Sequence, residues 1–116
     1  MQYVCLVYAE DDAFQALGPA GQKTLDADSL AYDRELERLG HLVLAHALHS
    51  ERESKVVRRR QKKKLVIDGP FTETKEQLVG FIVIEATGMG EAVAIAGDIP
   101  MAGIGTVVVR ETLDFA

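Results

Sequence analysis

Three segments of this 116-residue chain are apolar at nearly every position, and this pattern constrains the fold more than any other feature. They run from Gln2 to Tyr8, from Leu78 to Glu85 and from Ile104 to Arg110. Because neighbouring side chains of a strand point to opposite faces, these strands would be apolar on both faces. Two helices can cover only one face, and monomers rarely expose a large apolar patch. We therefore predict that two copies pack sheet against sheet; the alternative is a monomer whose loops and hairpin cover that face.

The remaining patterns predict the order of the elements. Apolar residues recur at helical spacing between Ala20 and Leu39, and Gly40 stands where a left-handed residue ends a helix. The other predicted elements are a helical turn or two at Glu10 to Leu17, a strand at Leu42 to Leu48, a hairpin of Lys55 to Arg60 with Lys63 to Ile67, and a helix at Glu91 to Ala96. This order fits one domain, residues 1–116, with an α+β fold: a ferredoxin-like sandwich with an added β-hairpin.

The composition excludes several classes of protein. Hydrophobic residues make up 47% and charged residues 27% of the chain, which is a globular composition. The single cysteine, Cys5, excludes an internal disulfide framework and a Cys-rich zinc site. No apolar run is long enough to span a membrane, and no basic stretch precedes the first apolar segment as in a secretory signal. We expect a soluble cytoplasmic protein.

The basic residues are concentrated in the predicted hairpin. Residues 55–64 hold seven of the 13 lysines and arginines, whereas the chain as a whole has a net charge of −5. Such a run could neutralise phosphates, but no aromatic residues are interleaved with it for base stacking. A solvated hairpin is therefore favoured over a nucleic-acid site. Its turn, near Gln61 and Lys62, contains no glycine or asparagine, which leaves the turn type open.

The three histidines do not form a metal site in one chain. On a strand, His41 and His49 would share a face but lie roughly 26 Å apart, and His46 would point the opposite way. His46 would lie on the face of Leu42, Leu44 and Leu48. It is either a hydrogen-bonded interior residue or a general acid or base.

The polar segment from Asp68 to Gln77 has both a structural and a functional interpretation. Structurally, Asp68 can accept amide hydrogens from the turn after it, Pro70 fixes the bend, and Thr74 with Gln77 matches a capping box that would start a helical turn. Functionally, polar side chains could converge on a small ligand beside an apolar wall, with Asp68 and Glu73 sharing acid and base roles. The residues of this predicted site are Asp68, Phe71, Thr72, Glu73 and Lys75.

The same segment, Asp-Gly-Pro-Phe-Thr-Glu-Thr-Lys-Glu-Gln, resembles the signature of the DGPF-domain family within the YCII-related proteins. The opening MQYVCLVYAEDD, the helix end from Glu35 to Gly40 and the pair Ile99-Pro100 are also similar to that family. The resemblance implies a ferredoxin-like fold that dimerises into an α/β barrel. It further implies an association of some members with extracytoplasmic-function sigma factors and a suspected activity through a His–Asp pair. The YCII branch has a histidine on its first long helix, whereas this chain has Tyr32 and Asp33 there.

Together these observations predict a small homodimer that binds a small metabolite near Asp68. Asp68 would act as acid or base with His46 as its proton partner, while Thr72, Glu73 and Lys75 would orient a polar or anionic ligand and Phe71 would form a wall. No cofactor or metal is implied. The alternative is a non-catalytic module whose basic hairpin and dimer surface engage a partner such as a sigma factor. The sequence does not decide whether the protein is an enzyme.

Overall fold

The centre of the molecule is a four-stranded antiparallel sheet with the strand order β2-β5-β1-β6. The computed structural model describes residues 1–72 and 74–115. The sheet consists of β1 (Gln2–Ala9), β2 (Leu42–Ala47), β5 (Gln77–Glu85) and β6 (Thr106–Glu111). The helices are α1 (Asp11–Ala16), α2 (Gly18–Arg38) and α3 (Met89–Gly97), with short 3-10 turns η1 (Glu51–Glu53) and η2 (Pro100–Gly103). The strands β3 (Lys55–Arg60) and β4 (Lys63–Asp68) form a separate hairpin.

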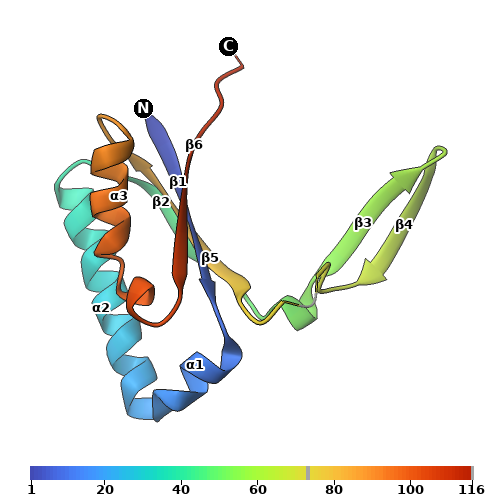
Figure 1. Ribbon diagram of the computed structural model, residues 1–116, viewed down its shortest axis with the longest axis horizontal. Helices are drawn as coiled ribbons and strands as arrows, with labels where there is room; N and C mark the ends of the chain where they lie inside the picture. Colours follow the sequence, from blue (N-terminus) through green and yellow to red (C-terminus); the bar gives the residue numbers. More distant parts are fainter. Residues whose placement is uncertain (73, 116) are drawn as a thin grey trace.

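One face of the sheet is covered by α2 and α3, as Figure 1 shows. Cys5 on β1 lies opposite Ile82 on β5, and both are buried with Tyr3 and Ile84 against Leu36 of α2 and residues of α3. Burial raises the pKa of the Cys5 thiol to about 11, so the thiol behaves as a small apolar group. The mixed α+β class predicted from the sequence is confirmed.

The other face of the sheet has no helix over it. We call it the open face, and it consists of Val4, Leu6, Tyr8, Leu44, His46, Leu48, Val79, Phe81, Val83, Thr106, Val108 and Arg110. Its members on the inner strands β1 and β5 are half-buried, and Leu44, Leu48 and Val108 are exposed. The expectation that the central strands are apolar on both faces is confirmed. Packing of a second copy on the open face stays a prediction.

A bulge in β2 corrects one expectation about His46. The register shifts between Leu42 and Leu44, so Leu42 lies opposite Ile84 and packs against the core. His46 lies opposite Phe81 and shares the open face with Leu44 but not with Leu42. A bulge places one extra residue on one strand and so interrupts the two-residue alternation from which the prediction was made.

The hairpin β3–β4 projects from the body on the side away from the helices (Figure 1). Its strands pair from Lys55 with Asp68 to Arg60 with Lys63, as predicted. At the turn, Gln61 and Lys62 both have positive φ angles, of 49° and 66°. Two consecutive left-handed residues are typical of a type I′ turn, which matches the right-handed twist of the strands and here forms without glycine.

No helix in the described ranges is both long and apolar enough to cross a membrane.

We expect Ile84→Ala to lower the free energy of unfolding by about 2–5 kcal/mol, because the removed atoms leave a cavity in the tightest part of the core. The control is Val93→Ala on the exposed side of α3, which should change stability by less than about 1 kcal/mol. Urea unfolding followed by circular dichroism measures both. Similar losses for the two variants would contradict this description of the core.

Candidate functional site

A cavity of about 1100 Å³ lies between α2 and the β2–β5 side of the sheet. Residues from α1, α2, β2, η1, β5 and η2 line it. Its apolar wall includes Leu25, Tyr32, Ala45, Ile82 and Met101. This volume is at the upper end of the range for small-molecule sites, which combine apolar walls with a few polar groups.

Two acidic residues of α2, Asp26 and Asp33, line the cavity, and of these Asp33 is half-buried whereas Asp26 is exposed. Asp33 follows Ser29 by four residues, so both side chains lie on the same side of the helix and line the cavity. The carboxylate of Asp33 makes no hydrogen bond or ion pair with the described residues. Burial raises the pKa of Asp33 above its ordinary value. A half-buried carboxyl group of this kind, facing a cavity, is a candidate for acid–base chemistry.

Tyr32, beside Asp33, has a structural bond instead. Its hydroxyl donates a hydrogen bond to the carbonyl oxygen of Ile95, at 2.7 Å, and so joins α2 to α3. Burial, together with the negative charges of Asp98 and Cys5 when ionised, raises the pKa of Tyr32 to about 12. The phenol therefore stays neutral and acts as a donor.

His46 lines the same cavity from the other side of the sheet. The cavity extends around the end of β2, so it includes His46, Leu48, Val79 and Phe81 of the open face. The imidazole ring of His46 lies 5.9 Å from the ring of Phe81, centre to centre. Its prediction as a residue of a ligand site is thus compatible with its position.

The other two histidines face different partners. Nδ1 of His41 is 2.9 Å from the carbonyl oxygen of Glu85, and His49 lies 3.8 Å from the carboxylate of Glu53. Across residues 1–72 and 74–115, no cluster of three or more His, Cys, Asp and Glu side chains is arranged to hold a metal ion.

The predicted site residues of the 68–77 segment do not all reach the cavity. Lys75 lines it, together with Pro70 and Thr74. Asp68 ends β4 as an exposed residue, and its carboxylate pairs with the ammonium group of Lys55. Phe71 is exposed beneath the guanidinium group of Arg58, which lies 5.0 Å from the ring centre. Thr72 is also exposed and outside the lining, and Glu73 lies outside the described residues.

Two local expectations for this segment were wrong. Among the described residues, no amide of the turn donates to Asp68: its carboxylate binds Lys55, and the amide of Gly69 donates to the carbonyl of Ser54. Thr74 and Gln77 do contact each other, but the side-chain amide of Gln77 donates back to the carbonyl and hydroxyl of Thr74. These bonds close a bend that leads directly into β5, so no helical turn begins there.

Asp33 was not among the predicted site residues. The sequence does contain a signal for it, because Ser29 and Asp33 are polar residues within the stripe that also holds Leu25 and Leu36. Polar residues on the core side of an amphipathic helix need a hydrogen-bond partner or a space filled by solvent or ligand. The pattern alone does not tell which of these applies.

Comparison with known proteins identifies the class to which this fold and site belong. The model of the YCII-related domain matches residues 1–116, and the chain belongs to this family. An uncharacterised protein of Rhizobium meliloti (strain 1021) is 30% identical over 106 residues, which are 91% of this chain and 86% of the relative.

A similar solved structure is that of 5-chloro-2-hydroxyhydroquinone dehydrochlorinase from Burkholderia phenoliruptrix, in complex with 2,5-dihydroxybenzoquinone. The TM-score is 0.59 and the identity is 16%, with 97% of this chain and 94% of the other covered. At this identity the likeness shows a shared fold.

We expect Asp33→Asn to stabilise the protein near pH 7. The pKa of Asp33 is higher in the folded than in the unfolded chain, so the folded state binds more protons between the two pKa values. Its contribution to stability is therefore present below the unfolded pKa and is lost as the pH rises through the folded pKa. Asparagine carries no charge to bury. The melting temperature of the Asp33→Asn variant should therefore exceed that of the wild type near pH 7, and the two melting temperatures should be similar near pH 3.

Thermal unfolding at the two pH values measures this difference. Asp28→Asn, at an exposed position of the same helix outside the cavity, is the matched control. A lower melting temperature of Asp33→Asn near pH 7 would show that the carboxylate is stabilised rather than strained by its surroundings.

Proposed function

We propose that this protein binds a small polar metabolite in the cavity beside α2 and transfers protons to or from it. The observation that carries the proposal is the position of the Asp33 carboxyl group, half-buried in the cavity wall without a partner among the described residues. Such a group costs stability in the empty site, and sites that bind or transform ligands commonly contain groups of this kind.

Asp33 and His46 are the two groups on the cavity wall best suited to acid–base chemistry. The raised pKa of Asp33 brings its protonation closer to neutral pH, where a general acid is most effective. An imidazole is the usual complementary base, and His46 lines the part of the cavity on the open face, whereas Asp33 lines the part beside α2. We assign the proton-transfer roles to these two residues, with Lys75 orienting a polar or anionic substituent.

A protein of similar fold suggests which ligand class to propose, a compact and planar one. The related dehydrochlorinase was solved with 2,5-dihydroxybenzoquinone, a flat ring with oxygen substituents. The cavity of this chain offers comparable chemistry, since Tyr32, Phe81 and aliphatic side chains form apolar walls and polar groups line the rim. We therefore propose an oxygenated cyclic compound as the ligand class.

A second copy on the open face would complete the site. Val79, Phe81 and His46 belong both to the open face and to the cavity lining. A partner packed there, in the sheet-to-sheet arrangement of a dimeric α/β barrel, would exclude water from the His46 side and strengthen electrostatic interactions within the cavity. We propose this homodimer as the functional form.

The roles of Asp68, Phe71 and Thr72 stay predictions, and in one chain these residues lie outside the cavity. A non-catalytic module that engages a sigma-factor-related partner is the second candidate function. The specific observation in its favour is the exposed basic hairpin, which extends beyond the body and is free to contact another protein.

To test binding, we would titrate the protein with 2,5-dihydroxybenzoquinone by isothermal titration calorimetry. We expect Ser29→Phe to weaken binding at least tenfold, because the larger side chain occupies the cavity. Leu30→Phe, on the exposed side of the same helix, should bind like the wild type.

Proton transfer is tested with the same probe in deuterium oxide, by following exchange of its ring hydrogens in proton NMR spectra. Wild-type protein should accelerate exchange, and Asp33→Asn and His46→Gln should each reduce the acceleration at least tenfold. Binding without acceleration would favour a non-catalytic module, and absence of binding would argue against this ligand class.

Dimerisation predicts a particle of twice the 12.7 kDa chain mass in multi-angle light scattering at micromolar concentration. Leu6→Lys, in the middle of the open face, should yield monomers because two buried ammonium groups would face each other. Leu30→Lys on α2 is the matched control and should stay dimeric. A monomeric wild type would contradict the proposed assembly.

A further inference from the structure

The hairpin β3–β4 exposes apolar side chains on both of its faces. Residues directly opposite in an antiparallel pair share a face, so Val57 and Val66 lie on one face and Leu65 and Ile67 on the other. Their exposed fractions are 63% and 60% on the first face and 51% and 59% on the second. An isolated two-stranded hairpin is at best marginally stable in water. This hairpin therefore requires a surface to pack against.

The hairpin is also strongly basic, and its one acidic residue, Asp68, pairs with Lys55 at the base of the hairpin. Arg58, Arg60 and Lys63 share one face by register, and none of them forms an ion pair within residues 1–72 and 74–115. Residues 55–64 carry seven basic and no acidic residues, a charge of +7. The rest of the chain carries six basic and 18 acidic residues, a charge of −12. The remainder of the chain, Asp68 of the hairpin included, thus carries an excess of the opposite charge.

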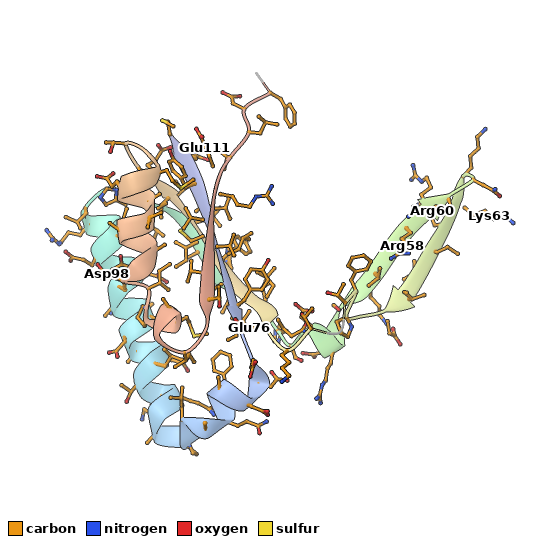
Figure 2. All side chains as sticks on the ribbon, viewed as in Figure 1. Arg58, Arg60, Lys63, Glu76, Asp98 and Glu111 are labelled. Atoms are coloured by element: carbon orange, nitrogen blue, oxygen red, sulfur yellow. The ribbon has the colours of Figure 1, made fainter. Side chains whose placement is uncertain are left out.

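Within its own chain, the hairpin lies away from acidic residues of the body. Figure 2 places Arg58, Arg60 and Lys63 along the hairpin, well separated from Glu76, Asp98 and Glu111 of the body. The hairpin leaves the body on the side of the open face (Figure 1). Both the open face and the hairpin carry exposed apolar side chains.

We propose that the hairpin is an arm that clasps a second copy of this chain. The body of the second copy lies against the open face and the arm, its acidic residues contact the basic end of the arm, and the apolar residues on the face of the arm that carries Arg58 and Arg60 are buried against it. Two-fold symmetry makes the contact reciprocal, so each chain contributes one arm and receives one. This inference rests on the homodimer proposed above, and it adds an intermolecular contact that lies outside the sheet-to-sheet interface.

A second copy explains the apolar base of the arm better than nucleic acid does. A phosphate backbone would pair with Arg58, Arg60 and Lys63 but would leave Leu65 and Ile67, on the same face of the arm, exposed. The charge of −12 on the remainder of the chain would also repel a polyanion near the arm, whereas it attracts the arm of a partner.

The test compares two charge reversals of equal size in the full-length chain. Arg58→Glu with Arg60→Glu alters the arm, and Lys23→Glu with Arg34→Glu alters exposed positions of α2. Analytical ultracentrifugation gives the dimer dissociation constant at low and at high salt. We expect the arm variant to have a dimer dissociation constant about tenfold or more above that of the wild type at low salt, and this constant should depend little on salt. The α2 variant should stay within about threefold of the wild type.

A second measurement stays informative if the arm variant folds poorly. A photo-reactive benzoylphenylalanine replaces Leu65, which shares the face of Arg58, and equal amounts of ¹⁵N-labelled and unlabelled protein are mixed and irradiated. Mass spectrometry of the products should show arm peptides joined to body peptides of opposite label. Cross-links confined to one chain would overturn the clasp.

The remaining outcomes separate the clasp from the proposals on which it rests. A wild-type dimer whose dissociation constant is equal for both charge variants would overturn the clasp and leave the dimer intact. A monomeric wild type would overturn both, while the calorimetric titration of the cavity would still report on ligand binding. Salt-sensitive binding of a 20-base-pair DNA duplex that only the arm variant loses, with its dimer unchanged, would overturn the clasp in favour of nucleic acid.

Discussion

The structure depends on the burial of one face of a sheet whose inner strands are apolar on both faces. Cys5 and Ile82 face each other across β1 and β5, and this register directs Tyr3 and Ile84 toward α2 and α3. The same two-residue period directs Leu6 and Phe81 to the opposite side. The two packed helices cannot cover both faces, so the apolar open face follows from the same pairing that forms the core.

The cavity lies where the helix layer and the sheet are not in full contact. Small residues line it on both sides, with Ser29 on α2 and Ala45 and Gly80 on the strands. At Gly80 the strands approach so closely that a Cβ atom would lie 2.9 Å from the carbonyl oxygen of His46. Asp33 occupies a position of the helix where an aliphatic side chain would fill the space.

Charge is unevenly distributed along the chain, with seven of the 13 basic residues between positions 55 and 64. Arg58, Arg60 and Lys63 of the hairpin lie far from Glu76, Asp98 and Glu111 of the body, and both the hairpin and the open face carry exposed apolar side chains (Figure 2). In a single subunit, the basic hairpin therefore lies away from the acidic residues of the body, and apolar side chains of the hairpin and the open face are exposed to water. In the proposed dimer, the association of two subunits would pair the opposite charges and bury the apolar side chains. It would also close the cavity on the His46 side.

The sequence by itself determined the elements, the apolar character of both sheet faces, the hairpin and the family, because these depend on local periodicity and on short contiguous motifs. It did not determine the bulge in β2, because a bulge is selected by pairing with β5 rather than by the sequence of one strand. Nor did it determine that Asp33 and His46 line one cavity while Asp68 pairs with Lys55 outside it. Those neighbours come from segments far apart in the chain, and only the packing of α2 on the sheet and the outward path of the hairpin decided which of them meet.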